Sequence, residues 1–128
     1  MRVYIAAPWV RRPEAIEVGK QFTAAGHELT CRWFDHQTDG DPMDSTGVTC
    51  DPYIIRHQAH EDIADVRRAD VLVVLNLQKS EGKAVETGIA IAAGIPVVSV
   101  GPRSNIFQSL GHEVETVDAA LAVLKTLR

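Results

Sequence analysis

Two carboxylic acids, Glu86 and Asp62, are the residues of this sequence best suited to do chemistry. Glu86 falls in the first turn of a helix predicted over Lys83 to Ala93, just after a valine-rich strand predicted over Val71 to Leu77. In open α/β sheets, ligands bind in the crevice beyond the carboxyl ends of the strands. An acid in a first turn also complements the helix dipole, so Glu86 alone does not decide between the two roles.

Asp62 projects from the middle of an apolar stripe on a second helix, predicted from Pro52 to about Arg68. The stripe consists of Ile55, Ala59, Ile63 and Val66. Burying an unpaired carboxylate costs several kcal/mol, so such a group is normally paired, hydrogen-bonded or protonated. Asp62 is therefore either a functional acid or a structural one that pairs with Arg67 or Arg68.

The other polar side chains of this second helix are predicted to face solvent. Glu61 and Asp65 fall on the flank of the apolar stripe, and His57 and His60 lie on the opposite side. The five histidines are scattered, without a helical HExxH motif or an acidic cluster, so we expect no metal site.

Two carboxyl groups on either side of a glycosidic bond are the minimum set for retaining glycosyl transfer, in which one attacks and the other handles the proton. Tyr4, on the first predicted strand, could hold the attacking group with its hydroxyl. The motif GxGxxG is absent, so a dinucleotide-binding site is not expected. GxxxxGK[ST] and GxSxG are also absent, which argues against an ATPase-type phosphate loop and against the nucleophilic serine of an α/β-hydrolase.

The elements that must position these residues alternate between strands and helices. The predicted strands are Arg2 to Ala7, His27 to Trp33, Val71 to Leu77, Ile95 to Val100 and Glu113 to Val117; the predicted helices are Glu14 to Ala25, Pro52 to Arg68, Lys83 to Ala93 and a final one capped by Asp118. This alternation predicts a three-layer α/β sandwich with a five-stranded parallel sheet, Rossmann-like and most simply in flavodoxin-like order.

Two details of this architecture bear on the site. On the helix after the central strand, the residues predicted to face the sheet are Val85, Ile89, Ala92 and Ala93, with Gly88 allowing a close approach. The stretch from Asp35 to Cys50 has no periodicity, and a connection of this length suggests a lid or a loop on the substrate side.

Composition limits the class of protein. With 128 residues, we expect a single domain over residues 1–128. A net charge of −4 argues against a nucleic-acid polymer as partner, and no apolar run is long enough to span a membrane. Cys31 and Cys50 form no CxxC pair, and there is no signal-peptide pattern, so the expected location is the cytoplasm.

At four places along nearly the whole chain, the sequence resembles the nucleoside 2-deoxyribosyltransferase family. These are VYIAAPW, EDIADVRRADVLVVL, SEGKAVETGIAIAAGIPVV and RSNIF. The most specific part is the strand followed by G-x-x-x-E-x-G-x-A, which here comprises Gly82, Glu86, Gly88 and Ala90.

The resemblance implies roles for individual residues. Glu86 matches the nucleophile that attacks the anomeric carbon, Asp62 the acid that acts on the departing base, and Tyr4 the tyrosine beside the nucleophile. Trp9 matches an aromatic residue near the base. Asn105 matches a residue that a neighbouring subunit contributes at the 5′ end of the sugar, so the resemblance implies a homo-oligomer, a dimer or larger, and no cofactor.

One position departs from the transferase pattern. Transferases that exchange bases usually carry a carboxylate two residues before the motif glycine Gly82, and here that residue is Ser80. A serine resembles instead the related N-glycosidases, which hydrolyse deoxynucleoside 5′-monophosphates, because a carboxylate would repel the phosphate. The further donors that could bind a phosphate are Arg11, Arg12, Lys83 and Ser104, although each arginine could equally be a solvated surface residue.

The sequence thus predicts an enzyme that cleaves the N-glycosidic bond of a deoxynucleoside or its 5′-monophosphate and passes the sugar to a nucleobase or to water. It does not distinguish the two acceptors, the preferred base or the sugar. A strict hydrolase, a non-catalytic nucleotide-binding module and an enzyme acting on another ribosyl compound are the alternatives.

Overall fold

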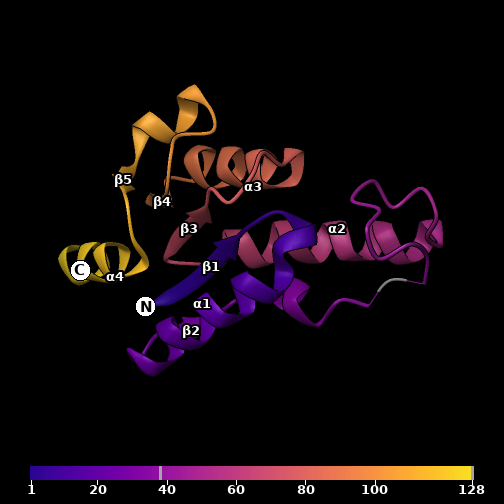
Figure 1. Ribbon diagram of the computed structural model, residues 1–128, viewed down its shortest axis with the longest axis horizontal. Helices are drawn as coiled ribbons and strands as arrows, with labels where there is room; N and C mark the ends of the chain where they lie inside the picture. Colours follow the sequence, from indigo (N-terminus) through magenta and orange to yellow (C-terminus); the bar gives the residue numbers. More distant parts are fainter. Residues whose placement is uncertain (38, 128) are drawn as a thin grey trace.

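The computed structural model describes residues 1–37 and 39–127 and consists of a five-stranded parallel sheet covered by helices on both faces (Figure 1). In chain order the elements are β1 (Arg2–Ala6), η1 (Trp9–Arg11), α1 (Arg12–Ala24), β2 (Glu28–Leu29), η2 (Arg32–Asp35), α2 (Pro52–Arg67), β3 (Val71–Leu75), α3 (Glu81–Ala92), β4 (Val97–Val100), η3 (Ile106–Leu110), β5 (His112–Val114) and α4 (Val117–Thr126), where η marks a 3-10 helix. The strand order β2-β1-β3-β4-β5 confirms the predicted fold class and flavodoxin-like order.

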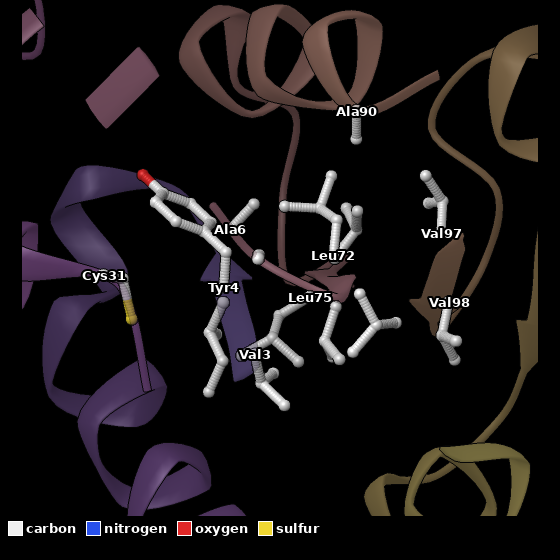
Figure 2. Packing of buried hydrophobic residues seen from close by; sticks show 14 of the residues in the cluster. Val3, Tyr4, Ala6, Cys31, Leu72, Leu75, Ala90, Val97 and Val98 are labelled. Atoms are coloured by element: carbon white, nitrogen blue, oxygen red, sulfur yellow. The ribbon is translucent and has the colours of Figure 1, made fainter. Parts of the chain in front are cut away.

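The sheet is buried on both faces at its centre. All five residues of β3 are buried, as their unbroken run of valine and leucine predicts. In the parallel register Tyr4 lies beside Leu72 and Leu72 beside Val97, so these three side chains share one face. Figure 2 shows this face turned toward Ala90 of α3, while Val98 points to the opposite side.

The second strand is much shorter than predicted. Only Glu28–Leu29 pair with β1, and the chain then turns into the 3-10 helix η2. This turn buries the indole ring of Trp33, whose Nε1 donates to the carbonyl oxygen of Ile5 at 2.8 Å. The bond satisfies the one polar atom of the buried indole, which favours the turn over a longer strand.

The prediction of which face of α3 is buried was wrong for Val85, Ala92 and Ala93, which are exposed, while Ile89 is partly buried against the core. The buried residues are Lys83, Thr87 and Ala90, whereas Val85 is 60% exposed. A side chain at Gly88 would meet no atom within 4 Å, so this glycine does not serve a close approach to the sheet. Hydrophobicity alone misplaced the face because the buried lysine is held by hydrogen bonds that the pattern does not reveal.

Two helix starts show how capping sets the boundaries. Asp51 caps α2 as predicted, its carboxylate accepting from the backbone N–H of Tyr53 at 2.8 Å. The last helix is capped by Thr116, which accepts from the N–H of Ala119 at 3.1 Å, and not by Asp118. Either residue type makes a good cap, so sequence alone did not separate two candidates so close together.

Asp65 is fully buried, contrary to the prediction that it faces solvent. Its carboxylate accepts from the backbone N–H of Arg32 at 2.9 Å and from the Arg32 guanidinium at 2.9 Å, and Arg68 Nε donates at 3.2 Å. Arg68 therefore pairs with Asp65 and not with Asp62. The cluster of Asp65, Arg32 and Arg68 fixes α2 to the segment after β2. On the same helix, Ile63 was predicted to be buried but is 40% exposed.

Replacing Asp65 with alanine should destabilise the fold by about 2–3 kcal/mol, because several charge-assisted hydrogen bonds are lost at a buried position. Both arginines are about half exposed and can be hydrated, which limits the loss. Urea unfolding followed by circular dichroism measures it. As a control, Glu17→Ala removes an exposed pair with Lys20 and should cost less than about 0.5 kcal/mol; equal losses in the two variants would contradict this role of Asp65.

Candidate active site

Glu86 is presented by the first turns of α3 at the carboxyl edge of the sheet. Ser80 begins this helix, its hydroxyl accepting from the N–H of Lys83 at 3.2 Å. From β1, the hydroxyl of the fully buried Tyr4 donates to Glu86 Oε2. Strand and helix thus fix the carboxylate from two sides.

Burial governs the ionisation of this pair. Loss of solvent raises the pKa of Glu86 to about 8, against the hydrogen bond from Tyr4, which lowers it, while the charge of Asp62 raises it further. Burial and the neighbouring Glu86 carboxylate also raise the pKa of the Tyr4 hydroxyl, so Tyr4 stays protonated and acts as a donor.

Asp62 extends from the middle of α2 into the same region. Its Oδ1 atom is buried and accepts no hydrogen bond from the described residues. Burial raises the pKa of Asp62 to about 6, and the nearby carboxylates of Asp65 and Glu61 add to the shift, while His36 and Arg32 oppose it. A buried carboxyl oxygen without a partner is what a proton or a ligand would satisfy.

Glu86 and Asp62 line one cavity of about 870 Å³. Its wall comes from η1, η2, α2, the start of α3 and the loop between η2 and α2. Apolar and aromatic surface is supplied by Trp9, Trp33 and Val85. A cavity with aromatic walls and two carboxyl groups of raised pKa has the size and the chemistry of a small-molecule active site.

The loop predicted as a lid does form part of this cavity. Of its described residues, those that belong to the wall are His36, Gln37, Asp44, Ser45, Thr46, Gly47 and Cys50. Asp44 organises the loop by accepting from the N–H groups of Thr46 and Thr49 at 2.9 and 3.0 Å. Trp9 Nε1 donates to the carbonyl oxygen of Pro42 at 2.8 Å, which connects the loop to η1.

The residues predicted to bind substrate divide into two groups. Trp9, Ser80, Gly82 and Lys83 belong to the cavity wall. The residues that do not belong to it are Arg11, which pairs with Glu14 at 3.0 Å, Ser104, which donates to Asn76 Oδ1 at 2.8 Å, and Asn105. The Asn105 side chain caps η3, where it accepts from the N–H of Phe107 at 3.0 Å.

Lys83 and Arg12, the other proposed phosphate donors, already have partners within the chain. The ammonium of Lys83 is buried and donates to Asn76 Oδ1, the carbonyl oxygen of Gln78 and Ser104 Oγ at 3.0, 2.9 and 3.1 Å. All three of its N–H groups are therefore used. The guanidinium of Arg12 stacks on Trp9, 4.5 Å from the ring centroid.

Sequence reasoning missed His36 and Gln58 in the cavity wall. His36 ends η2 and Gln58 lies on α2, on the side toward the loop. No motif marks either residue: His36 lies at the start of an irregular segment, and Gln58 is a polar residue on α2 whose neighbour in that segment, Gln37, is far away in the sequence. Among residues 1–37 and 39–127, no cluster of three or more His, Cys, Asp and Glu side chains could hold a metal ion.

A family model described as nucleoside 2-deoxyribosyltransferase matches residues 3–124. The chain belongs to the nucleoside 2-deoxyribosyltransferase family. Membership indicates an enzyme of the glycosyl-transferase or glycosyl-hydrolase type. No curated protein matches the sequence significantly.

Solved structures with the same fold are distant in sequence. A conserved protein from Enterococcus faecalis V583 is 20% identical, with 98% of each chain covered and a TM-score of 0.71. A 2-deoxyribosyltransferase from Bacillus psychrosaccharolyticus is 17% identical, with 99% of this chain and 96% of the other covered and a TM-score of 0.73. A CMP N-glycosidase from Clostridium botulinum is 13% identical, with 98% and 99% covered and a TM-score of 0.59. At these identities the likeness establishes the fold.

No helix in the described part of the chain is long and apolar enough to cross a membrane.

Replacing Glu86 with glutamine should stabilise the fold at high pH. Since burial raises the pKa of Glu86 to about 8, from an ordinary value of 4.5, the native state loses stability as the pH rises through this interval. The neutral amide avoids this loss, so Glu86→Gln should gain about 4 kcal/mol over the wild type near pH 8 and little near pH 4.

Chemical unfolding of both proteins across this pH range measures the difference. Glu81→Gln, an exposed residue in the first turn of the same helix, is the matched control and should show no such gain. A constant difference between Glu86→Gln and the wild type at all pH values would contradict the proposed burial of the Glu86 charge.

Proposed function

We propose that this protein cleaves the N-glycosidic bond of a deoxynucleoside or its 5′-monophosphate through a covalent glycosyl intermediate on Glu86. The observation that carries the proposal is that Glu86 and Asp62, two carboxyl groups of raised pKa from different helices, line one cavity. Membership of the nucleoside 2-deoxyribosyltransferase family supports the same reaction class.

In the first half of the reaction, a carboxylate oxygen of Glu86 attacks the anomeric carbon as the bond to the base nitrogen breaks. The electron pair of that bond moves to the base, and Asp62 delivers the proton that neutralises it. The products are a glycosyl ester on Glu86 and a neutral base. In the second half, Asp62 takes a proton from the acceptor, which attacks the anomeric carbon and releases Glu86 as a carboxylate.

For this reaction to start, Glu86 must be ionised and Asp62 must carry the proton. In the free protein, burial favours the proton on Glu86 more than on Asp62. A bound nucleoside reverses this preference, because a base nitrogen beside Asp62 accepts a hydrogen bond from its protonated form. The positive charge that develops at the anomeric carbon stabilises the Glu86 carboxylate, as does the hydroxyl of Tyr4.

The wall of the cavity favours an unphosphorylated substrate. Lys83 and Ser104, which could have bound a phosphate, use their donors on Asn76 and Gln78. Asp44 and Glu81 add negative charge to the wall, with Lys79 as the further cation. We therefore propose unphosphorylated deoxynucleosides as substrates, and membership of the nucleoside 2-deoxyribosyltransferase family supports a free nucleobase as the acceptor.

A strict hydrolase of deoxynucleoside 5′-monophosphates is the second candidate, and Ser80 is the observation that favours it. A serine stands where base-exchanging transferases usually carry a carboxylate, so this position does not repel a phosphate. Its hydroxyl accepts from the N–H of Lys83 and keeps its own proton for a ligand.

We further propose that the active form is a homo-oligomer, at least a dimer, in which Asn105 of one subunit reaches the sugar bound by its neighbour. Its side-chain oxygen caps η3, which leaves the amide N–H₂ group as a donor. The apolar side chains that follow Asn105 are unusually exposed in the single chain: Ile106 by 73%, Phe107 by 58% and Leu110 by 70%. An interface over η3 would bury them.

Replacing Glu86 with alanine should abolish turnover, and Asp62→Asn should lower it by about 10²- to 10⁴-fold, because the first change removes the nucleophile and the second the proton donor. The assay incubates the protein with each deoxynucleoside or its 5′-monophosphate, with and without a second free base, and resolves the products chromatographically. Exchange of bases on unphosphorylated nucleosides identifies the transferase, and release of the base without exchange from monophosphates identifies the hydrolase.

Glu17→Gln, on the exposed face of α1, is the control variant and should retain wild-type turnover. Wild-type turnover in Glu86→Ala would show that Glu86 is not the nucleophile. A wild-type protein that binds nucleosides without releasing base, and whose binding survives Glu86→Ala, would instead be a non-catalytic binding module.

Mixing inactive Glu86→Ala with inactive Asn105→Asp should restore activity, because a mixed dimer contains one site with both native residues. The introduced carboxylate would preserve the cap of η3 but lack the amide donor. With random exchange of subunits, roughly a quarter of wild-type activity is expected in an equal mixture. Absence of recovery in a mixture shown to exchange subunits, or a monomeric active protein in sedimentation, would overturn the shared site.

A further inference from the structure

A chain of polar contacts runs from the surface of α2 to the wall of the cavity. His57, whose side chain is 72% exposed, contacts Glu61 Oε1 through its Nε2 at 2.6 Å. The other carboxylate oxygen of Glu61, Oε2, lies 3.2 Å from Nε2 of His36. The side chain of His36 is only 11% exposed and belongs to the same cavity as Asp62.

The position of His36 is fixed from its backbone as well as from its ring. Arg12 donates to its carbonyl oxygen, and the guanidinium of Arg12 is itself stacked on Trp9. Glu61, which orients the ring, also lies 3.8 Å from Arg32 Nε. A side chain held this firmly has few alternative orientations, as residues that select ligands require.

These contacts determine which atom of the ring is left for a ligand. The hydrogen bond to His36 lowers the pKa of Glu61, which is therefore a carboxylate and accepts a hydrogen from Nε2. In the neutral imidazole ring the other nitrogen, Nδ1, then carries a lone pair and acts as an acceptor. Within residues 1–37 and 39–127, Nδ1 of His36 has no hydrogen-bond partner.

We propose that His36, oriented by Glu61, selects the base of the substrate and favours bases that carry an exocyclic amino group. The inference rests on the proposed function, since it assigns the substrate of the same cavity. Asp62, which is proposed to protonate the leaving base, belongs to the same wall, as do Trp9 and Trp33, whose rings are suited to packing against a base. An amino group donates to Nδ1, whereas an oxo group at the same position would place two acceptors against each other.

Bases with an amino group should be favoured over bases with an oxo group by about 10- to 100-fold, the usual effect of leaving a polar group in a site without its hydrogen-bond partner. The charged groups around the ring are Glu61 and Asp62 from α2, Arg32 from η2 and Arg12 from α1. The proposal concerns the neutral imidazole ring of His36, so the wild type and all variants are compared at the same pH.

The experiment compares base pairs that differ by an amino or an oxo group: adenine with hypoxanthine, and cytosine with uracil. Two quantities are measured for each, the affinity of the free base by calorimetry and kcat/KM for the deoxynucleoside. His36→Phe keeps a ring without nitrogens, His36→Asn keeps an amide oxygen near the place of Nδ1, and Glu61→Gln removes the charge that orients the ring. His60→Gln, an exposed histidine on the same helix, is the control.

The wild type should favour amino-bearing bases by at least about 10-fold. His36→Phe should reduce this ratio to near one, His36→Asn should retain much of it, and His60→Gln should retain it fully. Glu61→Gln, which leaves the His36 ring in place, should give an intermediate ratio and provides a second test should His36→Phe fail to fold. A wild-type preference for oxo bases, or an unchanged ratio in both His36→Phe and Glu61→Gln, would overturn the assignment.

The two readouts separate this inference from the proposed function. If the wild type releases no base from any nucleoside but binds adenine more tightly than hypoxanthine through His36, the proposed reaction fails and the base selection stands. If base release occurs and the ratio does not depend on His36, the reaction stands and the inference fails. Absence of binding by all four free bases and of any turnover overturns both.

Discussion

The loss of solvent around two carboxyl groups is the physical constraint on which the candidate site depends. Neither Glu86 nor Asp62 forms an ion pair that would compensate its burial within the described residues, and desolvation is the largest cause of the raised pKa of each. The fold therefore gives up stability at the edge of the sheet to keep two acids whose protonation changes near neutral pH. The buried strands β1 and β3 and the clustered charges around Asp65 supply the rigidity that this requires.

Two carboxylates on α2 illustrate how neighbours can have opposite environments. Asp65 is fully buried, but two arginines and a backbone N–H saturate its oxygens. Asp62, one turn earlier, has a buried oxygen without a partner among the described residues. The hydrogen bonds of Asp65 hold α2 in place, whereas Asp62 keeps an oxygen beside the cavity that can still accept a hydrogen bond or a proton. Structural and chemical roles are thus separated by three residues on one helix.

The central strands and the place of Glu86 near the start of α3 were predictable because they depend on short-range patterns, and the strand order followed from the alternation of strands and helices. The valine-rich runs mark buried parallel strands, and G-x-x-x-E-x-G-x-A follows one of them. Asp62 was detectable because it interrupts an apolar stripe. The face of α3 was not predictable, since Lys83 is buried through hydrogen bonds to Asn76, Gln78 and Ser104, from three separate positions along the chain. His36 was missed for a similar reason, because its partner Glu61 lies on a different element.

The loop between η2 and α2 is held together mainly by its own residues. Asp44 accepts four hydrogen bonds from Thr46 and Thr49, and Asp41 and Asp39 bind N–H groups within or next to the same segment. At its start it is tied to the rest of the protein through His36, which contacts Arg12 and Glu61, and further along Trp9 donates to Pro42. Such a segment can accept a substitution at Ser45 without disturbing the sheet. Variation of this loop is consequently a route by which related proteins could diverge in the compounds they accept while the pair of acids stays the same.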